Sequence, residues 1–404
     1  MYDAIVVGAR CAGSPTAMLL ARKGYRVLLL DRATFPSDTP KGHFIQPSGV
    51  AYLERWGLLG RVVAAGTPAV RRTTFDLGPF ALAGSPRWPT GQVAEAYAPR
   101  RSLLDQILVE AAVAAGAELR ERYSVEGLVV EAGRVTGIRG RVNGRAATES
   151  ARIVIGADGI YSRVARAVDA PAYQVRPALS GAYWGYWSGV SLEGIEFSPR
   201  DGRLAGAFPT NDDLVCVWAQ WRHSEFHAVR ADVERRFLEA LDLAPSLAER
   251  VGSGTRETPF DGRFDLYNYL RRPFGPGWAL VGDAGYMKDP ITGQGIGDGF
   301  RDAELLTEAL DAGFSGRRPL GEALADYERQ RNEQAMPMYD FTCQLAALEP
   351  PAPEQRELYE ALRRSQAETD RFLGTVAGTT PIPEFFSDEN VARITGAAQV
   401  RPAA

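Results

Sequence analysis

The feature that most constrains the fold lies at the amino terminus, where a short apolar run leads directly into glycines. The stretch "AIVVGARCAG" begins at Ala4 and ends at Gly13. Its apolar part, 4–7, predicts a buried strand, and Gly8 and Gly13 stand as the outer glycines of the dinucleotide fingerprint G-x-G-x-x-G. The middle glycine is replaced by Arg10. A strand, a glycine turn and a helix in this order predict an α/β fold with a parallel sheet.

The next segment completes one strand-helix-strand unit. Apolar residues recur at helical spacing after Gly13, Gly24 ends that helix, and "YRVLLLD" forms a second strand that ends at Asp31. A carboxylate at this position accepts a hydrogen bond from a ribose hydroxyl, which favours FAD or NAD over NADP. We therefore place Asp31 and the adjacent Arg32 in a cofactor site. Arg10 either lies beside the cofactor phosphates or turns toward solvent.

Composition sets the class of protein. The chain has 404 residues, of which 45% are hydrophobic, and a net charge of -4, so we expect about two domains and no nucleic-acid partner. The abundance of Arg over Lys indicates a bacterial source. The first strand begins within three residues of Met1 and no apolar run approaches the ~20 residues of a membrane span, so we expect a cytoplasmic protein without a membrane partner.

Two distant segments repeat the pattern of strand, glycine turn and helix. Residues 153–164, "IVIGADGIYSRV", place Asp158 between glycines directly after a strand. Residues 278–302, "WALVGDAGYMKDPITGQGIGDGFRD", place Asp283 after another strand, and a Pro-Gly loop from Pro290 to Gly295 then opens a helix. Such a helix start offers free N–H groups and the positive end of a helix dipole, which stabilise negative charge on a bound group.

Together the three segments resemble the FAD-dependent aromatic hydroxylases of the p-hydroxybenzoate hydroxylase type, the group A flavoprotein monooxygenases. The resemblance covers roughly residues 1–335 and rests on the fingerprint, the D-G motif, and G-D followed by P-x-x-G-Q-G. It implies FAD as cofactor, NAD(P)H as a transient electron donor, and a C4a-hydroperoxyflavin that oxygenates a small aromatic or polycyclic substrate with molecular oxygen. The wider superfamily also contains geranylgeranyl reductases and flavin-dependent halogenases.

The resemblance also implies roles for single residues. Asp283 matches the aspartate that bonds the ribityl chain, Arg101 matches the arginine of the R-x-x-L-D segment, and Lys41 aligns more weakly with an arginine near the pyrophosphate. Gly297 departs from the family pattern, where many relatives have Asn. The full set of expected cofactor residues is Gly8, Arg10, Gly13, Asp31, Arg32, Lys41, Arg101, Asp158, Asp283, Pro290, Gly293, Gly295, Ile296 and Gly297.

Strand-like stretches interrupt this pattern between residues 171 and 275. We expect them to form, with 73–97, an antiparallel substrate-binding sheet inserted into a Rossmann-like FAD domain made of 1–72, 98–170 and 276–335. A helical segment, 336–404, follows; its stretch "APEQRELYEALRRSQAETDRFL" predicts one amphipathic helix that either caps the substrate domain or makes an oligomer contact.

Aromatic side chains of the predicted sheet supply a candidate surface for a flat apolar ligand. We expect substrate contacts from Trp184, Tyr186, Phe208 and Trp218, with plain sheet packing as the alternative for each. His43 is the candidate catalytic residue, as a proton relay or substrate-orienting group, with packing or capping as the alternative. No metal site is indicated, because His223 and His227 lack a third ligand.

The leading hypothesis is therefore an FAD-dependent, NAD(P)H-consuming monooxygenase of secondary metabolism. A geranylgeranyl-reductase-like enzyme is the alternative. A halogenase is disfavoured, because Arg71 and Arg72 stand where its catalytic lysine is sought and its W-x-W-x-I-P signature is missing. A separate flavin reductase as electron source and the oligomeric state stay open.

Overall fold

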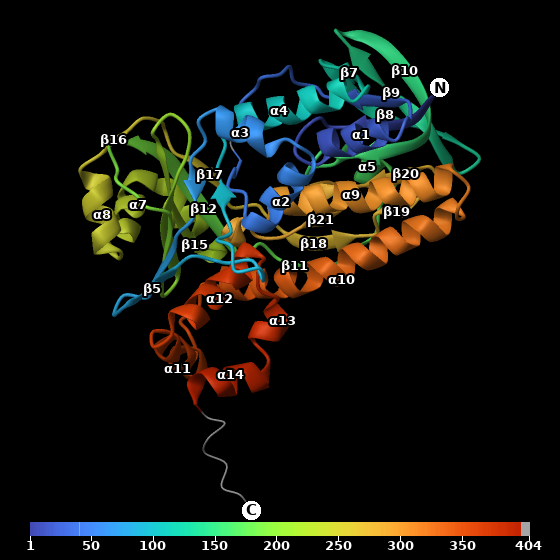
Figure 1. The fold of residues 1–404 in the computed structure, drawn as a ribbon. Helices are drawn as coiled ribbons and strands as arrows, with labels where there is room; N and C mark the ends of the chain where they lie inside the picture. The colour runs from blue at the N-terminus through green and yellow to red at the C-terminus, as the bar shows by residue number, and fades with distance from the viewer. Residues whose placement is uncertain (40, 397–404) are drawn as a thin grey trace, which may run out of the picture.

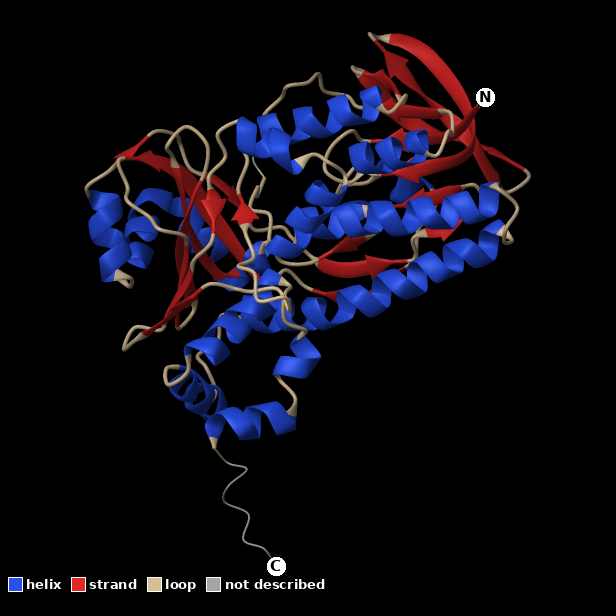
Figure 2. Cartoon of the chain, viewed as in Figure 1, coloured by secondary structure: helices blue, strands red, loops and turns tan. Residues whose placement is uncertain are grey.

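The computed structural model describes residues 1–39 and 41–396, and the first of its two large sheets has a parallel centre (Figures 1 and 2). Among these residues five strands run parallel in the order β20-β10-β1-β2-β7, and β19, β8 and β9 extend this sheet by antiparallel pairing. The bounds are β1 (Tyr2–Val7), β2 (Val27–Leu30), β7 (Glu118–Arg120), β8 (Tyr123–Glu131), β9 (Arg134–Val142), β10 (Arg145–Gly156), β19 (Phe274–Gly275) and β20 (Trp278–Leu280). The parallel arrangement confirms the predicted α/β class.

The alternation of side chains along β1 shows how this sheet is covered. Ala4 and Val6 face a core shared with several helices, whereas Ile5 and Val7 face a second core formed with β8, β9 and α5. Because both faces are buried, the strand is apolar throughout. The helices concerned are α1 (Gly13–Arg22), α2 (Pro47–Arg55), α3 (Leu59–Ala64), α4 (Arg101–Ala114), α5 (Arg163–Ala167) and α9 (Gly295–Phe314).

The second large sheet is mostly antiparallel and lies beside the first (Figure 2). Its order is β16-β12-β15-β14-β13-β4-β5, with β17 also on β12. One pair, β13 with β4, is parallel, which departs from the predicted all-antiparallel arrangement. The strands are β4 (Thr73–Asp76), β5 (Ala81–Gly84), β12 (Ser180–Ser188), β13 (Ile195–Arg200), β14 (Arg203–Pro209), β15 (Val215–Arg222), β16 (Thr255–Arg256) and β17 (Asp261–Arg263).

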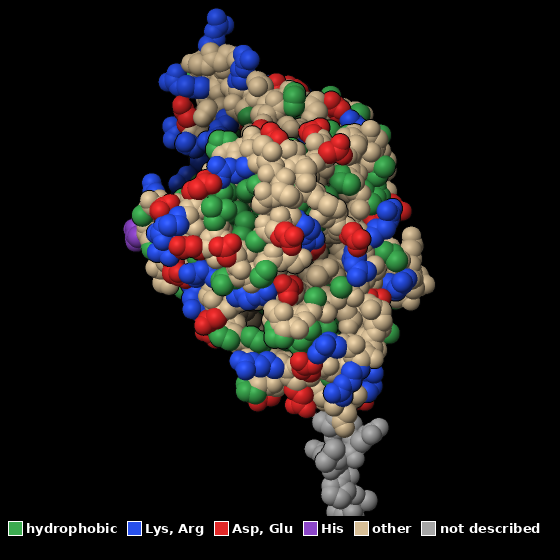
Figure 3. All heavy atoms as spheres, turned by 90° about the vertical axis from the view of Figure 1, so that its left-hand side faces the viewer, with side chains coloured by type: hydrophobic (Ala, Val, Ile, Leu, Met, Phe, Trp, Pro, Cys, Tyr) green, Lys and Arg blue, Asp and Glu red, His purple; other side chains and the backbone are tan. Residues whose placement is uncertain are grey.

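The outer face of this second sheet packs against short helices. Trp187, Val217 and Trp221 share a core with Phe237 and Leu241 of the covering helices. Beyond them the surface carries acidic and basic side chains side by side (Figure 3), as in the pair Arg235–Glu239. These elements are η1 (His223–Glu225), α6 (Phe226–Ala231), α7 (Val233–Asp242) and α8 (Pro245–Gly252).

Small elements join the two large sheets. A three-stranded antiparallel sheet β11-β18-β21 takes two strands from the 171–275 segment and one from the region that follows. Its strands and the remaining short elements are β11 (Ala172–Arg176), β18 (Asn268–Arg271), β21 (Tyr286–Met287), the pair β3 (Ala69–Val70) and β6 (Ala96–Tyr97), η2 (Gly282–Ala284) and η3 (Pro290–Thr292). The 171–275 segment therefore contributes to more than the substrate sheet.

The carboxyl-terminal helices correct two details of our expectation. Helix α10 (Leu320–Ala346) runs without a break across the boundary that we placed at 336. The predicted single amphipathic helix is two helices, α11 (Pro353–Leu362) and α12 (Gln366–Ala377), because Ser365 accepts a hydrogen bond from the Glu368 amide and begins a new helix. Two short helices follow, α13 (Ile382–Phe385) and α14 (Asp388–Thr395). None of the helices described is long and apolar enough to cross a membrane.

Candidate active site

A cavity of about 830 Å³ lies where the ends of the parallel strands meet the inner face of the second sheet. All three glycine-containing segments contribute to its wall, together with the inner face of the second sheet. Of the expected cofactor residues, twelve line it: Gly8, Arg10, Asp31, Arg32, Lys41, Arg101, Asp158, Asp283, Pro290, Gly293, Gly295 and Ile296. Segments far apart in the sequence thus converge on one space.

Gly13 and Gly297 do not line this cavity, and the structure gives each a packing role instead. A Cβ built on Gly13 would lie 1.7 Å from the Gly8 carbonyl oxygen, so only glycine allows α1 to start so close to the turn. A Cβ on Gly297 would lie 3.3 Å from the Cα of Gly49, where α9 crosses α2. A side chain at this position, such as the Asn of related proteins, would require α2 and α9 to separate by a few tenths of an ångström.

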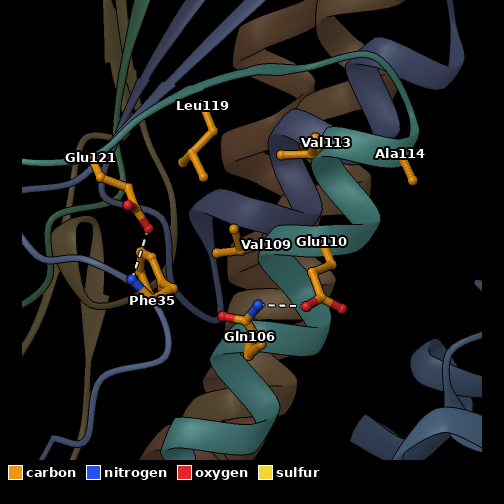
Figure 4. Close-up of a pocket in the computed structure, with 8 residues that line it drawn as sticks. All are labelled: Phe35, Gln106, Val109, Glu110, Val113, Ala114, Leu119 and Glu121. Atoms are coloured by element: carbon orange, nitrogen blue, oxygen red, sulfur yellow. Dashed lines mark hydrogen bonds between the residues drawn. The ribbon is translucent and has the colours of Figure 1, made fainter.

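A second hollow, of about 300 Å³, lies between α4, β7 and the loop at Phe35 (Figure 4). Apolar side chains such as Val109 and Leu119 form it, and the Phe35 amide donates to Glu121 Oε1 at 2.7 Å. No residue expected from the sequence to bind cofactor or substrate lines this hollow, and we place the site in the larger cavity.

Arg10 turns back onto the protein beside the cavity. Its guanidinium donates to Asp105 at 2.5 Å and to Ser37 Oγ at 2.9 Å, so the solvent-facing alternative is wrong. Asp105 is fully buried and also accepts from Arg101 at 2.9 Å. Two arginines therefore share one carboxylate, which leaves a net positive charge next to the start of α1 and favours an anionic group there.

Asp31 holds the turn that follows β1. Its two carboxylate oxygens accept from the amides of Ala9 at 2.9 Å and Ala33 at 2.8 Å. Each oxygen keeps a second lone pair, so the carboxylate can still accept a hydroxyl donor from a ligand in the cavity. This geometry is compatible with the ribose contact expected from the sequence.

Two further carboxylates present oxygens that the described residues do not satisfy. Asp158 uses Oδ2 to accept from the Arg163 amide at 2.6 Å, whereas its Oδ1 is buried without a partner. Asp283 lines the cavity and its side chain accepts no hydrogen bond from the residues described. Burial raises the pKa of Asp283, and the positive charges of Lys41 and Arg101 oppose that rise. A polyhydroxylated chain such as the ribityl of FAD would supply the donors that the Asp283 carboxylate lacks.

The start of α9 forms the next part of the wall. Gly293 has φ +64°, and a Cβ on Gly295 would meet nothing within 4 Å, so the backbone here is open to the cavity. The first amides of the helix have no intrahelical partner. The donor set, the positive charge and the open backbone fit FAD.

Sequence reasoning missed a buried ionic group beside this helix start. Lys288, 5% exposed, donates to Asp298, which also accepts from Arg301 at 2.8 Å. Both Lys288 and Asp298 line the cavity. Burial lowers the pKa of Lys288, and the charge of Asp298 opposes this. The one available signal in the sequence was Lys288 itself, which stands between the G-D and P-x-x-G motifs and is one of only three lysines in the chain.

A second missed group lies at the polar end of the aromatic half of the cavity. Asp289 is buried and accepts from Ser180 Oγ at 2.5 Å, Gln220 Nε2 at 3.1 Å and the Ile291 amide at 3.0 Å. Burial raises the pKa of Asp289 and these hydrogen bonds oppose the rise. No motif in the sequence connects Asp289 with Gln220, because they meet only when the second sheet folds onto the loop.

The opposite half of the cavity is aromatic. Trp184, Phe208 and Trp218 line it as expected, and the Phe208 and Trp218 ring centroids are 5.5 Å apart. Tyr186 lies on the same face of its strand but is not part of the wall. Instead its hydroxyl reaches His43, which does line the cavity. The surface is suited to a flat apolar ligand.

His43 is buried and both of its ring nitrogens are used. Nδ1 lies 3.0 Å from the Ala98 carbonyl oxygen, which can only accept, so Nδ1 carries the proton and Nε2 accepts from the Tyr186 hydroxyl at 2.9 Å. Burial lowers the pKa of His43 to about 3. The imidazole is therefore neutral at physiological pH and offers no nitrogen to a substrate in this arrangement, which favours the packing alternative over a direct proton relay.

Comparisons with known proteins agree with this geometry. The FAD binding domain family matches residues 1–342. Kynurenine 3-monooxygenase from Salinispora arenicola is 28% identical over 84% of this chain and 78% of its own length, and digeranylgeranylglycerophospholipid reductase from Methanocella arvoryzae is 26% identical over 73% and 74%. The structure of the myxobacterial chondrochloren halogenase superposes with a TM-score of 0.79 at 24% identity and covers 100% of this chain and 98% of the halogenase, which shows a shared fold.

Proposed function

The chain belongs to the FAD binding domain family and is an FAD-dependent oxidoreductase, and from this premise we propose that it is a monooxygenase of aromatic or polycyclic small molecules. The observation that carries the proposal is the aromatic wall, Trp184, Phe208 and Trp218, which is continuous with the glycine-lined half in one cavity. The kynurenine 3-monooxygenase relative supports the same reaction class.

In the proposed reaction the substrate C–H, O2, NAD(P)H and a proton give the hydroxylated product, NAD(P)+ and water. FAD, when bound, would supply the redox chemistry that couples oxidation of NAD(P)H to oxygenation of the substrate. The other parts of the mechanism belong to residues of this chain. No second nucleotide fingerprint follows the first, so either NAD(P)H binds transiently or a separate reductase supplies the electrons.

In the cofactor half, the residues expected to bind are those around the convergent strand ends. The start of α1, with Arg10 and Arg101 beside it, holds the pyrophosphate, and Asp31 and Asp283 accept from hydroxyl groups. The free amides at the start of α9 would stabilise the negative charge that reduction places on the flavin.

In the aromatic half, the large rings would hold a flat substrate and exclude water from the reacting face, which would limit the loss of reducing equivalents from NAD(P)H as hydrogen peroxide. Asp289 and Gln220 form the polar end and orient a hydroxyl or amine of the substrate. His43 and Tyr186 act as positioning residues that fix the wall on the other side.

The test is oxygen consumption by the purified FAD-loaded protein with NADH or NADPH and a panel of aromatic probes that includes kynurenine, phenols and anthranilates. We expect one probe to stimulate NAD(P)H oxidation, with one atom of labelled oxygen gas in the product for each NAD(P)H consumed.

The geranylgeranyl-reductase alternative predicts a different result. A reductase saturates an isoprenoid double bond without oxygen, so product formation under anaerobic conditions and no label in the product would overturn the proposal. Label-free product that gains a halogen when chloride or bromide is present would overturn it in favour of a halogenase.

A further inference from the structure

The carboxyl-terminal helices contact the loop that opens α9. Gln294, the residue before α9, is 7% exposed and its amide Nε2 donates to the Val376 carbonyl oxygen at 2.6 Å. Val376 lies in the last turn of α12, where its carbonyl has no amide four residues further along the helix to bond. The Gln294 side chain thus provides a hydrogen-bond donor for a carbonyl at the end of a helix about eighty residues later in the chain.

The end of α12 is shaped for this contact. Gly378 follows the helix with φ +76°, and a Cβ on it would lie 2.6 Å from Ser48 Oγ on α2. A side chain at this position would push α12 away from both α2 and the loop. Close approach at Gly378 therefore keeps the Val376 carbonyl within reach of Gln294.

Two other helices support the same loop from behind. Gln46, at the start of α2, donates from Nε2 to the Thr292 carbonyl at 2.9 Å, and the Thr292 hydroxyl bonds the Thr342 hydroxyl of α10 at 2.9 Å. Pro290, Gly293 and Gly295 of this loop line the cavity. One side of the loop is thus fixed to helices while the other faces the ligand space.

The carboxyl-terminal helices pack against the second sheet through a buried apolar core. Leu358, Leu362, Phe372 and Phe385 form a buried core with Leu82 of β5 in the second sheet. Figure 1 shows α11 to α14 gathered below β5 and the end of α10. This segment therefore packs on the substrate sheet at β5 and also bonds the cofactor loop through Gln294.

We propose that the segment α11–α14 is a clamp that positions the Pro290–Gly295 loop for FAD, with Gln294 as the positioning residue. The clamp acts on cofactor binding and not on the fate of oxygen. It therefore rests on FAD binding alone and stands or falls separately from the proposed monooxygenation.

The experiment compares two leucine variants of the full-length protein. Gln294→Leu removes the donor to Val376. Gln366→Leu is the matched control, because Gln366 Nε2 donates to the Ala83 carbonyl at 3.0 Å and joins the same segment to β5 away from the loop. The readouts are the FAD dissociation constant from flavin fluorescence, the midpoint potential of the bound flavin, and the melting temperature of the apoprotein.

We expect Gln294→Leu to weaken FAD binding about fivefold, the size of one lost hydrogen bond, and to lower the midpoint potential because the α9 amides stabilise reduced flavin less well. Gln366→Leu should change neither quantity. An unchanged FAD dissociation constant and potential in Gln294→Leu, or equal changes in both variants, would overturn the clamp. So would a loss of affinity fully accounted for by a lower melting temperature of the apoprotein.

Discussion

The two halves of the cavity are built by different means. The cofactor half is made of glycines that permit close approach, the open starts of helices, and charged side chains fixed at strand ends. The aromatic half is made of side chains from the inner faces of different strands, which are brought together only when the second sheet forms. Backbone geometry demands particular residues at particular positions, whereas an aromatic wall can be built from many combinations.

The dependence of the cofactor half on backbone geometry should be strongest at Gly8. This residue has φ +104°, and a Cβ would lie 2.5 Å from the Ala157 carbonyl oxygen, so Gly8→Ala combines strain with a clash against the neighbouring strand. We expect a loss of about 3 kcal/mol or more in the free energy of unfolding and no retained FAD. Gly60→Ala in α3, where a Cβ meets nothing within 4 Å, is the control and should unfold like the parent in urea. Equal stability of both variants would contradict the close-approach argument.

His43 lines the cavity, and the pH dependence of protein stability tests whether it is buried as a neutral imidazole. Its pKa is about 3 in the folded protein against 6.5 as the ordinary value, so the unfolded chain binds the extra proton first as the pH falls. The contribution of the neutral His43 to the free energy of unfolding is fully present above pH 6.5. It falls by about 1.4 kcal/mol for each pH unit as the pH drops from 6.5 toward 3. In urea unfolding between pH 7 and 4, the free energy of unfolding of His43→Gln should fall less steeply with pH than that of the parent. Parallel curves for the two proteins would show that His43 is not buried as a neutral ring.

The aromatic half is tested by Trp218→Ala. Removing this ring takes away a large part of the wall, and we expect kcat/KM for the active probe to fall by a factor of about 30, or about 2 kcal/mol. The FAD dissociation constant should stay unchanged, because Trp218 lies in the aromatic half. A variant that loses FAD and keeps its preference for the probe would reverse our assignment of the two halves.

The smallest effect is expected at Tyr186, which is behind the wall. Tyr186→Phe leaves His43 Nε2 without its donor and should cost about 1 kcal/mol in the free energy of unfolding. Because Tyr186 does not line the cavity, KM for the probe should change less than twofold in steady-state assays. A tenfold rise in KM would restore Tyr186 as the substrate-contacting residue that the sequence predicts.

The same contrast explains what the sequence could and could not reveal. Gly8, Asp31 and Asp283 were predictable because each occupies a position defined by a strand end or a turn. Lys288 and Asp298 were not, since their pairing depends on how a loop returns to a helix ten residues later. Tyr186 shows the limit of strand alternation, which assigns the correct face but not the depth at which a side chain lies.

The helical end of the chain gives a second example. Its amphipathic pattern continues through Ser365, so periodicity predicts one helix, and only the cap at that serine divides it into α11 and α12. The contact of Gln294 with Val376 joins residues that no local pattern relates.

A crystal structure of the protein with FAD and an active aromatic probe bound would test directly whether the two halves of the cavity hold cofactor and substrate. We expect the adenosine end near Asp31, the flavin ring against the start of α9, and the probe between that ring and Trp218. A flavin ring bound outside this cavity, or a probe seated in the glycine-lined half, would contradict this assignment.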